Sequence, residues 1–93
     1  MMSQIPLDLG KVDKNEIDRE ILRTGIIAEY DAINLYNQMA DQAHDPNIKK
    51  VLYEIAKEEK THVGEFQAML LRLDKEQKAE LAAGEKEVKE LVD

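Results

Sequence analysis

Glu29, Glu59 and His62 carry metal-ligand side chains at positions where an apolar pattern would otherwise continue. Glu59 and His62 form a Glu-x-x-His unit, and on a helix this spacing puts both side chains on one face, about one turn apart. One metal ion can then contact both. A carboxylate buried without a partner is strongly disfavoured. We therefore expect these residues to be neutralised, paired or bound to a cation.

Each of the three residues, taken alone, has a simpler interpretation. Isolated Glu-x-x-His units arise often by chance, and Glu59 lies in the charged run 57–60, which is typical of a solvated helix face. His62 alone would be a satisfied core or boundary histidine, and Glu29 a buried, hydrogen-bonded acid. The conjunction favours a metal site, because these three residues interrupt the apolar stripes described below and no other ionisable residue does.

The elements that must position these residues are two long helices. Asp13 and Glu16 resemble a capping box, which predicts a helix from residue 13 to about residue 43. Asp45 is a good N-cap and Pro46 suits a first helical position, so a second helix is expected from there to about residue 73. A turn this short makes the two helices antiparallel neighbours.

The ends of the chain are predicted to be less regular. Residues 1–12 show no sustained period and are expected to form an irregular arm, with residues 13–93 as one helical domain. Asp74 followed by Gln77 predicts another cap and a short charged helix to about residue 83. Gly84 is expected to end that helix, with a polar stretch following it.

Apolar residues form a heptad-like stripe on each long helix, as helix bundles require. The stripe positions are Leu22, Gly25, Glu29, Ala32, Tyr36, Met39 and Ala43 on the first helix, and Ile48, Leu52, Ile55, Glu59, His62, Phe66, Met69 and Leu73 on the second. Further apolar positions flank them: Ile26, Ile33 and Ala40, and Ala56, Val63 and Leu70. One hairpin cannot cover faces this wide, so a partner chain is expected.

The three polar residues match half of a known ligand set. Di-iron sites in four-helix bundles take a Glu from each of two helices and Glu-x-x-His from each of the other two. This chain supplies one of each, as Glu29 and as Glu59 with His62. We therefore predict an all-α, ferritin-like antiparallel hairpin with a short C-terminal helix. Homodimerisation would complete the four-helix bundle and place a di-iron centre at the interface, bridged by Glu59.

Composition narrows the classes of ligand and partner. The 93 residues include no cysteine, which leaves carboxylate and imidazole as the strong metal ligands. The net charge of −7 disfavours binding to nucleic acid or anionic membranes and attracts cations. No apolar run approaches the ~18 residues needed to span a bilayer, and no secretory leader is evident. A cytoplasmic location is the expectation.

Other residues near the stripes have more than one interpretation. Tyr36 lies one heptad beyond Glu29, roughly 10 Å further along the helix. It is a candidate catalytic residue, as a hydrogen-bond partner or a redox-active phenol, although a core tyrosine with a satisfied hydroxyl is the simpler interpretation. Asp31, Glu58 and Glu65 flank the stripes and could guide iron, but ordinary surface charge is favoured for them.

Residues 26–36 (IIAEYDAINLY), with Glu58-Glu59-Lys60-Thr61-His62 following, resemble the encapsulated ferritins, especially the ferritin-like domain joined to encapsulin shells in some archaea. The similarity covers roughly residues 15–83. Its specific features are the gap from Glu29 to Glu59 (59 − 29 = 30) and the Glu-x-x-His unit in a two-helix chain.

The resemblance implies that subunits pair to form a di-iron ferroxidase centre and that the dimers assemble into a ring-shaped decamer. The ring would sit inside an encapsulin nanocompartment and oxidise Fe(II) to Fe(III) with oxygen, while the shell holds the mineral. Glu29, Glu59 and His62 match the family's ligand positions, and Tyr36 matches a tyrosine close to the centre.

The chain departs from the family pattern in three places. Leu35-Tyr36 stands where some members have Trp-Tyr. Ala28 replaces a glutamate found near the iron entry path in some members, so the resemblance does not carry that entry site over to this chain, and Asp31 is a candidate substitute. The chain also ends at Asp93 without the short apolar tail that docks many encapsulin cargoes, so either the tail has been lost or the native chain continues into another domain.

Two other functions stay open. A rubrerythrin-like peroxidase is disfavoured because the chain has no cysteine for a rubredoxin-type electron donor. A non-catalytic dimerisation module, with a structural zinc ion or no metal, is the other alternative. Aerobic Fe(II) titration distinguishes a ferroxidase from a structural module, because a structural module would bind iron without accelerating its oxidation.

Overall fold

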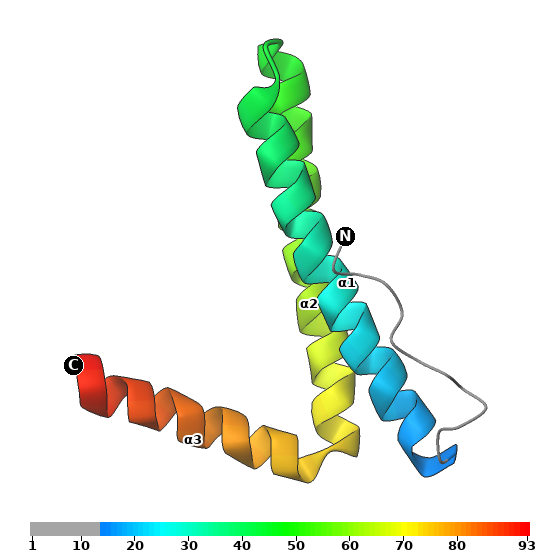
Figure 1. Cartoon of the computed structure of the whole chain (residues 1–93), viewed down its shortest axis with the longest axis vertical. Helices are drawn as coiled ribbons and strands as arrows, with labels where there is room; N and C mark the ends of the chain where they lie inside the picture. The colour runs from blue at the N-terminus through cyan, green and yellow to red at the C-terminus, as the bar shows by residue number, and fades with distance from the viewer. Residues whose placement is uncertain (1–13) are drawn as a thin grey trace.

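The computed structural model describes residues 14–93, which form three α-helices in chain order (Figure 1). These are α1 (Lys14–Gln42), α2 (Pro46–Leu73) and α3 (Lys75–Val92). No strand occurs in this part of the chain. The predicted all-α class is therefore confirmed. The expected arm at 1–12 and the Asp13 cap lie outside the described residues.

The turn between α1 and α2 is built as the sequence predicts. Asp45 Oδ1 accepts hydrogen bonds from the backbone N–H groups of Asn47 (2.7 Å) and Ile48 (3.2 Å). Pro46 begins α2, where its missing N–H costs nothing. With two residues between the end of α1 and Asp45, the chain reverses direction and the helices pack side by side (Figure 1). The hairpin, the end of α1 and both ends of α2 are thus confirmed to within one residue.

The core between α1 and α2 is a narrow seam of residues spaced seven apart. The buried apolar residues are Ile33, Ala40, Ala56, Val63 and Leu70. Ala40 and Ala56 are 0% and 2% exposed, so their small side chains let the helices approach closely. All five belong to the flanking positions. The heptad stripes lie beside this seam, and none of their residues is buried in one chain. Their role as the core of a bundle formed with a partner chain stays a prediction.

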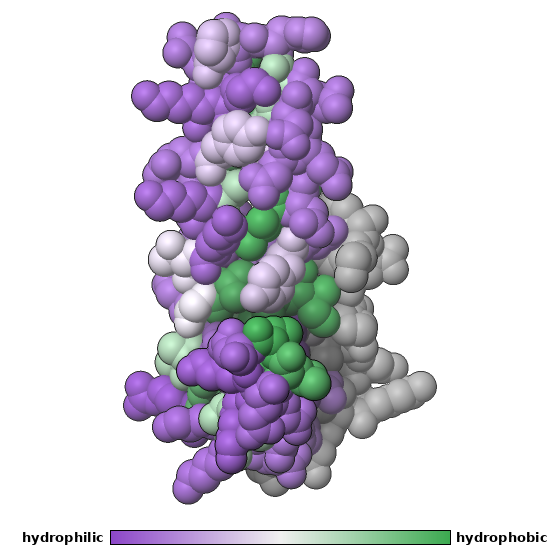
Figure 2. All heavy atoms as spheres, turned by 90° about the vertical axis from the view of Figure 1, so that its left-hand side faces the viewer, coloured by the Kyte–Doolittle hydropathy of each residue, from purple (hydrophilic) through white to green (hydrophobic). Residues whose placement is uncertain are grey.

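The stripes leave apolar surface open on the hairpin. Exposed fractions reach 38% for Met39, 55% for Ile48, 49% for Met69 and 46% for Leu73. On the face shown in Figure 2, apolar side chains are visible between hydrophilic ones above the base of the hairpin. Each helix of a hairpin has only one intrachain neighbour, so a single chain cannot bury both the seam residues and the stripe residues.

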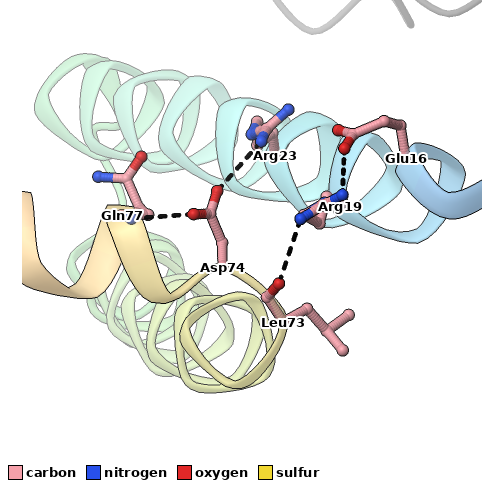
Figure 3. Close-up of polar contacts among 6 residues, drawn as sticks. All are labelled: Glu16, Arg19, Arg23, Leu73, Asp74 and Gln77. Atoms are coloured by element: carbon pink, nitrogen blue, oxygen red, sulfur yellow. Dashed lines mark hydrogen bonds and ion pairs between the residues drawn. The ribbon is translucent and has the colours of Figure 1, made fainter.

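Two arginines of α1 hold the corner between α2 and α3 (Figure 3). Arg19 Nη1 donates to the carbonyl oxygen of Leu73 at 3.4 Å and Arg19 also pairs with Glu16, while Arg23 Nη2 lies 3.2 Å from Asp74 Oδ2. Asp74 Oδ1 caps α3 by accepting from the Gln77 N–H at 2.9 Å. This backbone hydrogen bond, followed by the Arg23 guanidinium, lowers the pKa of Asp74 below its ordinary value.

Helix α3 extends further than the sequence predicts. It continues through Gly84 to Val92 and projects away from the hairpin (Figure 1). The prediction that Gly84 ends the helix is therefore wrong. Glycine costs a helix only about 1 kcal/mol relative to alanine, and the neighbouring alanines, glutamates and lysines are strong helix formers. Across residues 14–93, no helix has both the length and the apolar character needed to cross a membrane.

Candidate metal centre

Helices α1 and α2 bring together the three residues that interrupt the stripes. One ligand atom from each of Glu29, Glu59 and His62 lies within 4.8 Å of the other two. His62 Nδ1 is 3.3 Å from Glu59 Oε2 and 3.4 Å from Glu29 Oε2. Glu59 and His62 meet because they are one turn apart on α2. Glu29 joins them because antiparallel packing places its part of α1 alongside.

The two carboxylates are largely withdrawn from solvent. The side chains of Glu29 and Glu59 are each 18% exposed, whereas that of His62 is 45% exposed. Glu29 Oε2 has almost no access to solvent and accepts no hydrogen bond, since His62 Nδ1, at 3.4 Å, makes only a long ion-pair contact with it. A buried acceptor without a donor carries an unmet desolvation cost. A bound cation would remove that cost, so this oxygen fits a metal site.

The donor set also fits iron. Two carboxylates and one imidazole suit Fe, Mn or Zn, whereas the described residues offer no thiolate that would select a softer metal. Three protein donors leave the coordination shell of a six-coordinate ion incomplete. Water or side chains from a second copy would have to supply the rest.

A groove opens beside the ligands. Glu29, His62, Glu65 and Phe66 line a space of about 170 Å³. Glu65 is exposed, which agrees with its interpretation as surface charge, while Phe66 is half-buried. The groove therefore gives a small ion or molecule a route to the imidazole and to Glu29.

Tyr36 does not belong to this three-residue group. It lies seven residues along α1 from Glu29 and is half-buried, so its predicted role stays a prediction. Asp31 differs from its interpretation as surface charge, because it is half-buried and its Oδ2 is shielded from solvent without a hydrogen bond. Its place two residues after Glu29 puts it off the stripe, so the apolar period gives no signal for its burial.

The fold and the three-residue group define a ferritin-like helical hairpin, and comparison with solved structures supports that class. The crystal structure of the encapsulated ferritin domain from Pyrococcus furiosus superposes with a TM-score of 0.83 at 49% identity, covering 96% of each chain. A family described as a domain of unknown function, DUF2383, matches residues 19–90. The chain belongs to the encapsulated ferritins, as its sequence predicts.

Two curated relatives extend the comparison. The ferritin-like–encapsulin shell fusion protein of Pyrococcus furiosus is 62% identical over 72 residues, which are 77% of this chain and 21% of that protein. The encapsulin nanocompartment cargo protein EncC of Myxococcus xanthus is 39% identical over 69 residues, which are 74% of this chain and 52% of that protein. The chain thus spans about a fifth of the first relative and half of the second.

Proposed function

We propose that this protein is a ferroxidase that oxidises Fe(II) to Fe(III) at a di-iron centre shared between two copies of the chain. The observation that carries this proposal is the convergence of Glu29, Glu59 and His62 to within 4.8 Å. These residues are half of the ligand set of carboxylate di-iron proteins. Iron is the substrate, and dioxygen is the electron acceptor.

The need for a second copy rests on two independent features. The ligand group supplies three protein donors, and doubling it gives two carboxylates from α1 and two Glu-x-x-His units from α2. The stripe that carries these ligands also carries the apolar residues left exposed in one chain, such as Met39 and Met69. If the stripes of one chain packed against those of a second copy, the contact would complete the ligand set and bury the exposed apolar residues.

The residues of the chain have distinct tasks in this proposal. Glu59 would bridge the two irons, and Glu29 and His62 would bind one iron each. The four carboxylates of a dimer would offset the positive charge of two ferrous ions and favour the Fe(III) product. Bound iron supplies the redox chemistry, because each Fe(II) gives up one electron, which oxygen accepts. Tyr36, half-buried further along α1, is a candidate hydrogen-bond partner or electron donor.

We further propose that the protein acts inside an encapsulin shell within the cytoplasm. One relative is a fusion of a ferritin-like protein with an encapsulin shell, and another is an encapsulin cargo protein. By its resemblance to this family, the chain would form dimers that close into a ring-shaped decamer. Iron oxidised by the ring would then be stored or detoxified within the shell.

Aerobic Fe(II) oxidation by the purified protein tests the proposal, with native mass measured on the same samples before and after iron is added. We expect rapid oxidation by an assembled species that saturates near two irons per pair of chains. Glu29→Ala, Glu59→Ala and His62→Ala should each abolish the accelerated phase. Glu58→Ala is the matched control, since Glu58 is an exposed neighbour on the same helix, and it should oxidise iron as the wild type does.

Three results would contradict the proposal. Unchanged Fe(II) oxidation in all three ligand variants would show that the proposed centre does not carry out the reaction. A stable dimer that binds iron or zinc without accelerating oxidation would instead identify a structural metal site. Accelerated reduction of peroxide with little use of oxygen would point to the rubrerythrin-like alternative.

A further inference from the structure

We propose that Gly25 is a positioning residue for the metal ligands, because its missing side chain provides the space in which the Phe66 ring holds α1 and α2 together beside them. This inference rests on the proposed metal centre. It concerns two stripe residues that supply no ligand atom.

Gly25 and Phe66 lie level with each other, one turn away from the ligands. Gly25 precedes Glu29 by four residues on α1, and Phe66 follows His62 by four residues on α2. Because the helices are antiparallel, these two steps lead in the same direction along the hairpin. The Gly25–Phe66 contact is therefore the next layer below Glu29 and His62.

The fit between the two residues is tight. A Cβ atom at residue 25 would lie 3.2 Å from Cε1, Cε2 and Cζ of the Phe66 ring. Carbon atoms in ordinary contact are about 3.5–4.0 Å apart, so the ring rests almost directly on the glycine backbone. An alanine would force the ring or the helices to move by a few tenths of an ångström.

Backbone conformation does not require glycine at this position. Within residues 14–93 no glycine has positive φ, and α1 runs through Gly25 as regular helix. A glycine inside a helix costs stability relative to alanine, so its presence here calls for another reason. The close approach of the Phe66 ring provides it. Gly64 on α2 offers a contrast, since nothing lies within 4 Å of a Cβ built there.

Movement of the Phe66 ring would displace the metal ligands. Phe66 lines the 170 Å³ groove together with Glu29 and His62. A displaced ring would either enter that space or separate α1 from α2 at the layer next to the ligands. Metal sites need their ligands held to within about 0.5 Å, and changes to the residues that orient the ligands typically lower metal affinity about 10–100-fold.

Three variants test the proposal, with Co(II) as an optical probe of the ligand geometry under anaerobic conditions. For Gly25→Ala we expect Co(II) affinity about tenfold weaker and an altered visible spectrum, with helical content retained. Gly64→Ala is the matched control, and its affinity and spectrum should equal those of the wild type. Gly25→Ala with Phe66→Leu removes the clash and should recover most of the loss, so the two substitutions are coupled rather than additive.

The outcomes separate this inference from the proposed function. Wild-type affinity and spectrum in Gly25→Ala, or a double variant that binds Co(II) no more tightly than Gly25→Ala does, would overturn the role of Gly25 while leaving the metal centre intact. A wild-type protein that binds two Co(II) per dimer but does not accelerate Fe(II) oxidation would overturn the proposed ferroxidase activity. The positioning role of Gly25 would still be supported if Gly25→Ala weakens Co(II) binding as expected. If Gly25→Ala does not fold, a folded double variant that fails to bind Co(II) would also overturn the inference.

Discussion

The imidazole Nδ1 of His62 on α2 lies 3.4 Å from the carboxylate Oε2 of Glu29 on α1. The two helices therefore meet at a pair of potential metal ligands, and Glu59 Oε2 lies 3.3 Å from the same nitrogen. An ion bound here would join α1 to α2 within one chain. Metal binding should consequently stabilise the hairpin itself in addition to any effect on assembly.

The first prediction is that Zn(II), used as a redox-inert probe, raises the melting temperature. A ligand that binds only the folded state at 100 times its dissociation constant adds about 2.7 kcal/mol of stability. Calorimetry with and without Zn(II) measures the shift, and a chelator should reverse it. His62→Ala should lose the shift, whereas Glu58→Ala should keep it. A shift of equal size in both variants would place the bound zinc elsewhere.

The second prediction is that Glu29→Met separates stability from metal binding. Glu29 Oε2 is shielded from solvent without a hydrogen bond, and its contact with the partly exposed His62 imidazole is long, at 3.4 Å, so burial of the carboxylate is poorly offset without a metal ion. Methionine is of similar length and suits an apolar stripe. Without metal, we expect the variant to be as stable as the wild type, or more stable by about 1 kcal/mol.

Chemical denaturation of Glu29→Met with and without Zn(II) measures both effects. The added metal should stabilise the wild type and leave the variant unchanged. A variant that is clearly less stable than the wild type without metal would show that Glu29 contributes to the fold through a contact of its own.

Most of the hairpin is predictable from sequence because its signals are local. The Asp45–Pro46 pair fixes the start of α2 through two hydrogen bonds to the Asp45 side chain. The ligand group is predictable as well, since Glu29, Glu59 and His62 are out of place in apolar stripes. The stripes alone do not say which positions one chain buries. Packing around Ala40 and Ala56 decides that, and it depends on both helices at once.

Other features depend on contacts between distant residues and carry no local signal. The guanidinium of Arg23 reaches Asp74 across 51 positions of sequence, and Gly25 receives the ring of Phe66. At Gly84 a local signal is present, but it gives the wrong prediction. A glycine near a helix end favours termination locally, but here strong helix formers on both sides continue α3 to Val92.

The third prediction uses the neighbours Met69 and Leu70 to separate folding from association. Leu70 is 5% exposed and packs in the seam of the hairpin, whereas Met69 is 49% exposed on the stripe. Leu70→Ala should cost about 2–5 kcal/mol of folding stability by removing core contacts and leaving a cavity. Met69→Ala should instead weaken pairing of the chains.

Denaturation and analytical ultracentrifugation over a range of protein concentrations measure the two effects. Met69→Ala should dissociate at a higher protein concentration than the wild type does, with its monomeric hairpin still folded. Equal effects of the two substitutions on folding and on association would mean that the stripe is not the surface that pairs.

The fourth prediction concerns the corner that orients α3. Asp74 accepts from the Gln77 N–H and pairs with Arg23, and both interactions lower its pKa. Asp74→Ala removes the cap and the ion pair, so α3, which has no buried residue among its 18, should lose helical content. Asp74→Asn is the matched variant, because asparagine still caps a helix but carries no charge for Arg23. Glu85→Gln, which removes only the exposed ion pair with Lys89, should change little.

The same shift fixes the sign of the pH dependence at this corner. A carboxyl whose pKa is lowered by folding contributes stability that is complete above its unfolded pKa and is lost as pH falls through its folded pKa. The ordinary value for Asp74 is 3.8, so the contribution should be present at neutral pH and disappear below about pH 4. Circular dichroism from pH 7 to pH 2 measures it as the difference between the wild type and Asp74→Asn, since the other carboxyl groups titrate in both. Parallel curves for the two proteins throughout this range would mean that the Asp74–Arg23 pair does not hold α3 in place.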